Sequence, residues 1–310
     1  MKAVVLRGPG ELALEEFDEP VAGAGEAVVD VLAAGLNPVD LSRMEAAPLP
    51  SVPGNEGVGR LPDSTRVYFE RTREPFGSFA QRALVDERLP IPLPAELRTA
   101  DALTIGIAGL AGWLSLSHCA RLRPGESVLV LGASGPVGHV SVQAAKLLGA
   151  DRVVAAARDR AAIEPLRALG ADELVTLDGD YHPSLARAAR DGFDVVVDPL
   201  FGEPIAAALG VTALGARVVS VGASAGSTAT ITRSSLYGRS LLSYGNRLTP
   251  VAVKRAAYER MCRHVLAGEL TVARCELLPL ADFASAFVRQ AAHPHRKLVL
   301  VCDPTDPDLQ

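Results

Sequence analysis

The chain has 310 residues, and 48% of them are hydrophobic, which is enough to bury one large core or two ordinary cores. Its net charge is −5 and no stripe of basic residues stands out, which argues against nucleic acid or an anionic membrane surface as a partner. Its longest apolar stretches are interrupted by glycine or charge well before the length of a membrane span.

The first hundred residues favour β-structure. Residues 3–6 and 27–31 are apolar runs of strand length, and Gly8, Pro9 and Gly10 predict a turn after the first run. Four prolines between positions 38 and 53 exclude a long helix in that stretch. This part of the chain therefore predicts a β-rich domain with short elements.

The pattern changes near residue 102. Residues 102–119 are apolar and predict a buried helix that is interrupted at Gly109 and Gly112. A continuous apolar run at 127–131 predicts a buried strand, and a glycine-containing turn at 132–138 follows it. Residues 140–148 have helical spacing and end at Gly149.

The following segment alternates strands with helices. We expect strands at 152–156, 194–198 and 216–221, with helices at 161–169 and 205–214. This alternation is typical of a parallel, doubly wound sheet, and strands that are apolar throughout suit burial on both faces.

The remaining residues predict two amphipathic helices, at 251–266 and 280–291, and a closing strand at 297–301. The sequence therefore predicts an α/β protein in which a Rossmann dinucleotide-binding domain, residues 104–246, is inserted into a β-rich domain. That β-rich domain is discontinuous and consists of residues 1–103 and 247–310.

The turn at 132–138 is the strongest functional motif, because it follows a strand and opens a helix. Gly135 allows a pyrophosphate to approach the backbone, and Gly138 allows the helix to pack closely on the strand. The helix start adds free N–H groups and a partial positive charge. The residues predicted to contact the cofactor here are Ser134, Gly135, Pro136, Val137 and Gly138.

The end of the next strand distinguishes the two nicotinamide cofactors. An NAD-binding protein needs an acidic residue there for the ribose 2′-hydroxyl, whereas this chain has Ala157 followed by Arg158, Asp159 and Arg160. A guanidinium that binds a 2′-phosphate contributes about 1.5–3 kcal/mol. Arg158 and Arg160 therefore favour NADPH, although both residues also suit a solvated helix start, and Asp159 opposes a phosphate.

The four cysteines, at positions 119, 262, 275 and 302, show no CxxC spacing and no histidine at metal-ligand spacing. Reduced thiols in a cytoplasmic protein are the expected state. No role is assigned to His293 or His295, which flank Pro294.

Four segments together resemble the quinone oxidoreductase branch of the medium-chain dehydrogenase/reductase superfamily. Residues 33–40 (AAGLNPVD) resemble its AAGVNPxD segment, and residues 53–59 (PGNEGVG) resemble its PGxExxG segment. Residues 77–80 (GSFA) resemble its GxxA motif, and residues 128–138 resemble its nucleotide-binding turn. The resemblance covers nearly the whole chain and implies a GroES-like substrate domain, a Rossmann domain and a homodimer.

The resemblance also implies further contacts to the cofactor. Segments after two late strands of the Rossmann domain line the nicotinamide in relatives, and a basic residue that opens the last strand meets the pyrophosphate. An exposed edge strand at residues 240–244 is the expected dimer contact. The matching residues of this chain are Val221, Gly222, Ala223, Tyr244, Asn246 and Lys297.

Departures from the zinc-dependent relatives are as informative as the matches. Their catalytic zinc ligands correspond to Asn37, Asn55 and Ile107 here, and neither an amide nitrogen nor an isoleucine side chain binds zinc. The four-cysteine structural lobe is also missing, because no cysteine precedes Cys119. We therefore expect no metal.

Without a metal, hydride transfer needs an acceptor that stabilises its own negative charge. A quinone yields a phenolate and an activated alkene, such as an enone, yields an enolate, and both need less acid catalysis than a ketone. Asn37 is the predicted donor to the developing oxyanion, although its alternative role is a turn residue before Pro38. The predicted substrate-binding residues are Asn37, Asp40, Ala111 and Tyr244.

The sequence therefore predicts an NADPH-dependent, metal-free reductase of a small-molecule quinone or activated alkene. Two alternatives remain open, because a fold alone does not determine function. One is a dinucleotide-binding protein of the same fold with little reductase activity. The other is a reductase that is specialised for one biosynthetic substrate.

Overall fold

The computed structural model describes residues 1–292 and 295–309, so His293 lies outside the described residues. The chain forms two compact units. Unit 1 consists of Met1–Ile107, Tyr258–Glu269 and Arg274–Gln310, and unit 2 consists of Ala108–Ala257 and Leu270–Ala273. The predicted combination of a GroES-like β-rich domain with a Rossmann domain is confirmed.

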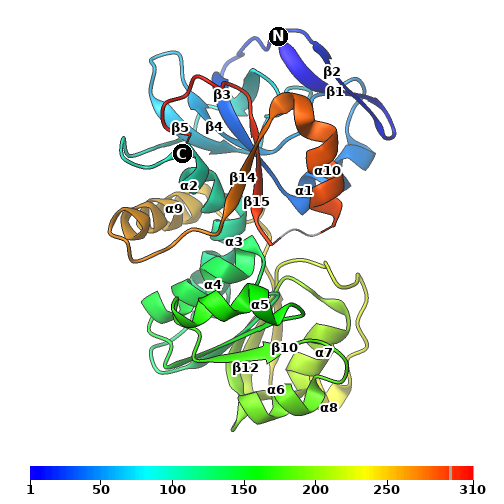
Figure 1. Ribbon diagram of the computed structural model, residues 1–310, viewed down its shortest axis with the longest axis vertical. Coiled ribbons are helices and arrows are strands. Elements are labelled where there is room, and N and C mark those ends of the chain that lie inside the picture. The colour runs from blue at the N-terminus through cyan, green and yellow to red at the C-terminus, as the bar shows by residue number, and fades with distance from the viewer. Residues whose placement is uncertain (293–294, 310) are drawn as a thin grey trace. The chain divides into compact units, whose positions relative to one another are not determined.

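Unit 1 is built on a mixed sheet of seven strands, in the order β14-β15-β3-β4-β5-β7, with β6 also paired to β3. Strand β15 runs antiparallel to β3, so strands from the two ends of the sequence, red and blue in Figure 1, lie side by side. The strands of this sheet are β3 (Glu26–Leu36), β4 (Glu56–Arg60), β5 (Arg66–Glu70), β6 (Arg82–Asp86), β7 (Ile91–Pro92), β14 (Cys275–Pro279) and β15 (Lys297–Val301). A separate pair comprises β1 (Lys2–Gly8) and β2 (Glu11–Glu16).

The helices of unit 1 are short, as the prolines require. Helix α1 (Pro38–Arg43) starts at a proline, whose fixed φ angle suits a first helical position. Helix α2 is Thr99–Thr104, and α10 (Phe283–Ala291) follows a 3-10 turn at Leu280–Asp282. The core beneath them includes Val29, Phe69, Phe79 and Phe287.

Unit 2 contains six parallel strands in the order β10-β9-β8-β11-β12-β13. The chain runs from β8 outward to β10 and then crosses to β11 on the other side of β8, which creates a topological switch point beside β8. The strands are β8 (Ser127–Leu131), β9 (Arg152–Ala157), β10 (Glu173–Thr176), β11 (Phe193–Asp198), β12 (Thr212–Ser220) and β13 (Ser240–Ser243).

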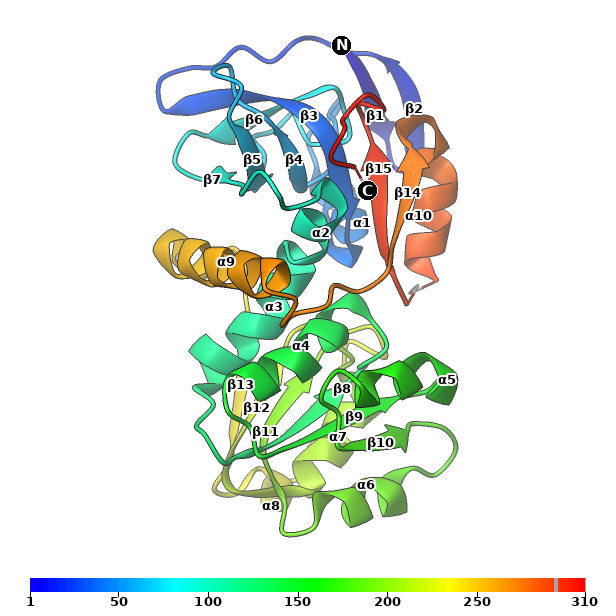
Figure 2. The same ribbon diagram turned by 60° about the vertical axis from the view of Figure 1, so that its left-hand side comes forward.

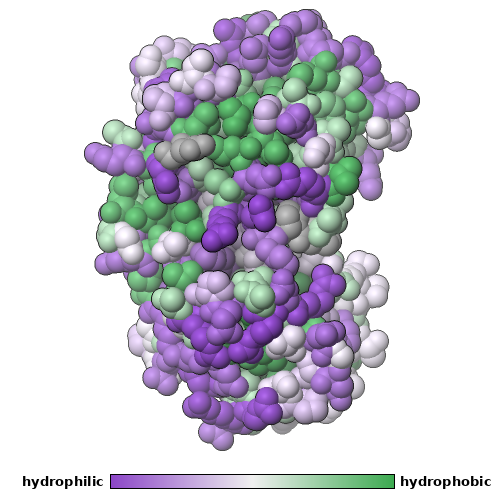
Figure 3. Space-filling model, viewed as in Figure 1, coloured by the Kyte–Doolittle hydropathy of each residue, from purple (hydrophilic) through white to green (hydrophobic). Residues whose placement is uncertain are grey.

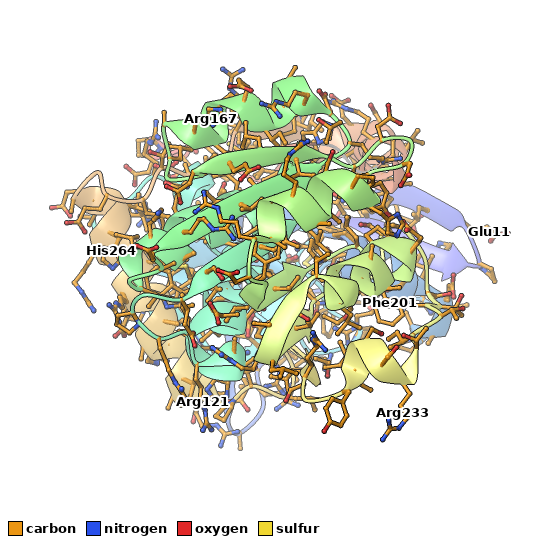
Figure 4. The ribbon with its side chains drawn as sticks, turned by 90° about the horizontal axis from the view of Figure 1, so that it is seen from below. Glu11, Arg121, Arg167, Phe201, Arg233 and His264 are labelled. Atoms are coloured by element: carbon orange, nitrogen blue, oxygen red, sulfur yellow. The ribbon has the colours of Figure 1, made fainter. Side chains whose placement is uncertain are left out.

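Helices cover both faces of this sheet. Arg167, which ends the 3-10 turn after α5, and Arg233, on α8, lie on opposite sides of the strands in Figure 4. The helices of this part of the chain are α3 (Ile107–Leu114), α4 (Pro136–Leu147), α5 (Arg160–Ile163), α6 (His182–Ala189), α7 (Gly202–Gly210), α8 (Arg233–Leu236) and α9 (Val251–Leu266). The core between sheet and helices includes Leu129, Val196, Phe193 and Ile205.

The unit boundaries fall at 107/108 and 257/258, where the sequence predicted 103/104 and 246/247. The second boundary lies later because α9 begins in unit 2 and continues into unit 1. The four residues from Leu270 return to unit 2, where the Thr271 N–H donates to Gln143 Oε1 over 2.8 Å. Of the helices and strands after residue 100, β10, β14, α6 and α8 were absent from the sequence prediction.

The predicted break at Gly109 and Gly112 is wrong. Helix α3 runs through both glycines and continues as a π-helix at Ser115–Ala120, whereas the chain breaks before it, at Ile105 and Gly106. Close packing of α3 on α4 requires glycine at position 112, because a Cβ there would lie 2.7 Å from the Val137 carbonyl oxygen on α4. The helix after β9 is also shorter than predicted, since Pro165 turns its continuation into a 3-10 helix.

Within the described residues, every helix is either too short or too polar to cross a lipid bilayer.

The outer edge of β13 is flanked by exposed apolar side chains. Leu214 is 72% exposed and Tyr237 is 64% exposed, and Leu236 and Leu241 are also exposed. The Gly215 N–H donates to the Gly238 carbonyl oxygen over 2.7 Å, which holds the start of β12 next to the loop that carries Tyr237. An unpaired strand edge among apolar side chains is a typical site of strand pairing between copies.

We propose that β13 pairs with β13 of a second copy, as the resemblance implied. Light scattering at micromolar concentration should give twice the chain mass of 32.4 kDa. The variant Leu241→Lys should give the mass of one chain, because a charged side chain on an edge strand opposes pairing. Val21→Lys, at an exposed apolar residue of unit 1, is the matched control and should leave the dimer intact. A wild-type protein with the mass of one chain would refute this assembly.

Candidate functional site

The turn between β8 and α4 in unit 2 has the geometry of a dinucleotide-binding turn. Gly132 has a φ of +58°, which favours glycine. Gly138 lies so close to Ala133 that a Cβ would be 2.4 Å from its Cα atom, so no side chain fits there. At Gly135 the nearest atom to a Cβ would be 3.6 Å away, which leaves the space before the helix open. The three glycines thus have the roles that the motif requires.

Helix α4 extends for 12 residues from this turn, next to the switch point of the sheet (Figure 2). The first N–H groups of a helix have no partner within the helix, and together with the helix dipole they attract phosphate. Ser134, Gly135, Pro136 and Val137 are half-buried at this end, and Gly138 is buried. The residues predicted to contact the pyrophosphate therefore fit that group.

The loops after β11 and β12 meet at the same edge of the sheet. The buried Asp198 carboxylate accepts hydrogen bonds from the N–H groups of Leu200, at 2.9 Å, and Phe201, at 3.0 Å. Burial raises the pKa of Asp198 to about 6. The Val221 N–H donates to the Asp198 carbonyl oxygen over 2.7 Å, so residues 221–223 are held at the carboxyl ends of the strands. This is where the resemblance places the nicotinamide.

Tyr244 lies beyond β13, at the same edge. Its N–H donates to the Ser220 carbonyl oxygen and its hydroxyl donates to Asn246 Oδ1, both over 2.8 Å. Burial raises the pKa of Tyr244 far above its ordinary value, so this phenol stays protonated at neutral pH. Ala111, predicted to contact the substrate, is buried within α3.

The two arginines after β9 differ in their surroundings. Arg158 is exposed, directly after the buried Ala157. The Arg160 guanidinium donates to Glu164 and to the Leu174 carbonyl oxygen, each over 3.0 Å. Arg158 thus fits the predicted contact with a 2′-phosphate, whereas Arg160 already has partners within unit 2.

Unit 1 contains a buried polar network centred on Glu56, the first residue of β4. Its side chain is fully buried and accepts hydrogen bonds from Asn37 Nδ2, the Tyr68 hydroxyl and the Ile107 N–H, each over 2.8 Å. The Lys297 ammonium forms an ion pair with the same carboxylate. Four donors from four separate parts of the chain therefore satisfy one buried carboxylate, as a buried charge requires.

Two glycines make room for this carboxylate. A Cβ on Gly35 would lie 2.4 Å from Glu56 Oε1, and a Cβ on Gly106 would lie 2.4 Å from Glu56 Oε2. Residue 106, in the break between α2 and α3, must therefore lack a side chain for the Ile107 N–H to reach Glu56.

Two residues with predicted site roles have partners within this network. Lys297, expected at the pyrophosphate, is only 2% exposed, and its ammonium donates to Asn37 Oδ1 over 2.6 Å as well as to Glu56. Asn37, expected to donate to a substrate oxyanion, directs its amide hydrogens to Glu56 and to the Gly35 carbonyl oxygen, the latter over 3.3 Å. Both side chains therefore act inside unit 1, where they fix the start of α1.

Asp40 completes the network. Its Oδ2 accepts a hydrogen bond from the Asn37 N–H over 2.8 Å, whereas its buried Oδ1 has no hydrogen-bond partner among the described residues. Burial, and after it the nearby charge of Glu56, raise the pKa of Asp40 to about 7, although the Asn37 N–H and Lys297 act in the opposite direction. The raised pKa follows from this burial, because desolvation disfavours the charged form of a carboxyl group.

The structure thus collects the predicted residues into two groups. Asn37, Asp40 and Lys297 meet in unit 1, and the glycine turn, Arg158, residues 221–223 and Tyr244 share the carboxyl edge of the sheet in unit 2. Sequence reasoning missed both Tyr68 and Glu56 as members of the first group. The signal for Glu56 was an acidic residue within the glycine-rich segment at 53–59.

The raised pKa of Asp40 predicts a pH dependence of stability. A carboxyl group with a raised folded-state pKa stabilises the fold below its unfolded pKa, and this stabilisation is lost as the pH rises through the folded pKa. The window here extends from about pH 4 to about pH 7. The variant Asp40→Asn should therefore gain unfolding free energy relative to wild type as the pH rises from 5 to 8, by at most about 3 kcal/mol.

Urea unfolding of wild type and Asp40→Asn across this pH range measures the difference in their unfolding free energies. Asp198 also has a raised pKa, but it is present in both proteins, so its contribution cancels in the difference. The control is Asp63→Asn, an exposed carboxylate whose pKa is lowered by hydrogen bonds from Thr65, so its variant should show no such rise. A difference between Asp40→Asn and wild type that stays constant with pH would contradict a protonated Asp40.

Residues 136–261 match the family model of the zinc-binding dehydrogenases. The residues present do not fit a catalytic zinc. At the three corresponding positions, the Asn37 amide binds Glu56 and Lys297, the Asn55 side chain accepts a hydrogen bond from Arg43 over 2.6 Å, and Ile107 offers only its backbone. Among the described residues, no three His, Cys, Asp or Glu side chains converge as metal ligands.

The chain is 30% identical to the quinone oxidoreductase of Rattus norvegicus over 69% of this chain and 70% of that protein. It is 31% identical to the 2-methylene-furan-3-one reductase of Solanum lycopersicum, over 56% of this chain and 49% of the other. It is also 31% identical to one protein of the phenolphthiocerol/phthiocerol polyketide synthase of Mycobacterium tuberculosis, but there it spans 11% of the relative's length and 74% of its own.

Among solved structures, the quinone oxidoreductase of Thermus thermophilus, also determined in complex with NADPH, has a TM-score of 0.80 and 31% identity. The match covers 97% of this chain and 100% of that one. Together with the glycine turn, these comparisons assign the chain to a family. It belongs to the quinone oxidoreductase-like branch of the medium-chain dehydrogenase/reductase superfamily.

Proposed function

We propose that the protein is a metal-independent reductase that uses NADPH to reduce a quinone or an activated alkene. The observation that carries this proposal is the donor set around Glu56. The positions that correspond to zinc ligands hold two amides and a backbone N–H, and these are bound to protein groups. The substrate must therefore be one whose reduction proceeds without a Lewis acid from these positions.

NADPH, when bound, supplies a hydride to an electron-poor carbon. The start of α4 holds the pyrophosphate, and the exposed Arg158 binds the 2′-phosphate. Residues 221–223 and Tyr244 position the nicotinamide. The Thermus relative, which was solved with NADPH, supports this choice of cofactor.

The acceptor is inferred from the chemistry that these residues offer. Hydride addition to an enone or a quinone leaves an enolate or a phenolate, whose charge is delocalised and which water can protonate. The names of the rat and tomato relatives, a quinone oxidoreductase and a 2-methylene-furan-3-one reductase, support both substrate classes. Asn37 and Asp40 contribute by fixing the start of α1, and no proton-donor role is assigned to either.

A second candidate is a reductase that serves one specialised biosynthetic substrate. The match to part of a polyketide synthase favours this candidate, because that relative is by name a biosynthetic protein. The same hydride chemistry applies, and only the range of acceptors differs. This alternative would be supported if the protein oxidises NADPH with one unsaturated acyl compound as the hydride acceptor but with no simple quinone or enone.

The test is a transfer experiment with NADPH that carries deuterium at C4, on the transferred hydride, with a simple enone and a simple quinone as acceptors. Deuterium should appear on the β-carbon of the enone product, at one deuterium per NADPH oxidised, with no flavin added. An enone product without deuterium would rule out direct transfer. NADPH that is bound but not oxidised with any acceptor would favour a dinucleotide-binding protein without reductase activity.

A further inference from the structure

Strands β9 and β10 end side by side at the carboxyl edge of the sheet in unit 2. Their register pairs Ala157 with Thr176, and the Leu177 N–H donates to the Ala157 carbonyl oxygen over 2.9 Å. Each strand end is followed by a charged, exposed residue: Arg158 comes directly after β9, and Asp178 comes after the buried Leu177, two residues beyond the end of β10. A basic and an acidic side chain therefore leave the sheet at neighbouring strand ends.

The other charged groups at these strand ends have partners in their own segment. The Asp159 carboxylate caps α5 by accepting hydrogen bonds from the N–H groups of Ala161, at 2.9 Å, and Ala162, at 3.2 Å. Arg160 is paired with Glu164. The charge of Asp159 is thus partly offset by the N–H groups at the start of α5, and the charge of Arg160 by Glu164.

Arg158 and Asp178 differ from these neighbours. Among the residues that the structure describes, neither side chain has an ion-pair partner, and Asp178 accepts only a local hydrogen bond from the Gly179 N–H, at 3.0 Å. The surface of unit 2 that contains β10, α5 and α6 faces the viewer in Figure 3 and is mostly hydrophilic, as expected for charges in contact with water. Both charges therefore remain available to act on a nucleotide.

We propose that Asp178 limits the preference of this protein for NADPH, by opposing the attraction of Arg158 for the 2′-phosphate. The inference rests on the proposed function, because it concerns the same nucleotide site. A 2′-phosphate carries a charge of about −1.5 to −2 at neutral pH, so a fixed carboxylate at the adjacent strand end repels it. NADH has a hydroxyl at that position and is affected little, so the two opposed charges act on NADPH selectively.

The effect is electrostatic and acts through water, so its size is modest and depends on salt. Removing one exposed carboxylate should tighten binding of a 2′-phosphate about threefold to tenfold at low ionic strength. Screening at about 0.5 M salt should reduce this gain to about twofold or less, since the Debye length is then only a few ångströms. Removing Arg158, which can contact the phosphate directly, should weaken binding about tenfold or more.

The experiment compares two probes of the adenosine site in the full chain by titration calorimetry. Adenosine 2′,5′-bisphosphate carries the 2′-phosphate, and adenosine 5′-monophosphate lacks it. The variants are Asp178→Asn, Arg158→Ala and, as a matched control, Asp191→Asn. Asp191 is exposed just before β11, at the amino edge of the parallel sheet, so its removal changes the net charge equally but at the opposite edge.

The expected result is tighter binding of the bisphosphate by Asp178→Asn only, with binding of the monophosphate unchanged within about twofold. An Asp178→Asn protein that binds the bisphosphate as wild type does would overturn the inference and leave NADPH binding intact. Weaker monophosphate binding would also overturn it, because Asp178 would then contact the ribose itself. A wild-type protein that binds neither probe would overturn the proposed function, and this inference with it.

Discussion

The buried ion pair between Glu56 and Lys297 is the constraint on which the architecture of unit 1 depends. It joins the first residue of β4 to the first residue of β15, and thus the N-terminal and C-terminal parts of this discontinuous unit. Removing one partner of such a pair leaves an uncompensated buried charge, which costs about 3–5 kcal/mol. Gly35 and Gly106 have no side chain because the Glu56 carboxylate occupies the space that a Cβ would need.

The same ion pair constrains the chemistry. Because Glu56 and Lys297 bind the Asn37 amide, the start of α1 is rigid and offers no free donor from that side chain. Burial raises the pKa of Asp40 beside them to about 7, which favours its neutral form and lowers the negative charge of the cluster. In the proposed function, unit 2 binds the nucleotide. Unit 1 provides a fixed arrangement of side chains that offers no zinc ligand at the corresponding positions. Such an arrangement suits an acceptor that stabilises its own negative charge.

Elements with a strong local signal could be predicted from the sequence. The strand, turn and helix at 127–147 follow from a continuous apolar run and glycines with steric roles, and α9 and β15 have the predicted bounds. Strand β10 has only four residues, and β14 (CELLP) contains a glutamate and a proline where β8 and β15 have an apolar run, so neither gives a clear strand pattern. The shortened helix after β9 reflects Pro165, whose effect outweighed an apolar pattern that continues beyond it.

The residues of the candidate site also fall into those that the sequence could predict and those that it could not. The glycine turn and Arg158 were predictable because one continuous segment contains them. The contacts of Asn37 and Lys297 were not predictable, because the Glu56 network joins the start of α1 to β4, β5, α3 and β15, and no local pattern indicates which side chains meet there. Asp178 was missed with β10, since its significance depends on the register of that strand with β9.

The central claim is that hydride transfer by this protein needs no metal. It is tested most directly by one measurement on the purified wild-type protein, which compares NADPH oxidation with an enone before and after exhaustive dialysis against a strong zinc chelator. Zinc content is determined by elemental analysis on the same samples. The account predicts far less than one zinc per chain and unchanged turnover, because Asn37, Asn55 and Ile107 provide no zinc ligands. One zinc per chain, together with turnover that is lost on chelation and restored by added zinc, would contradict it.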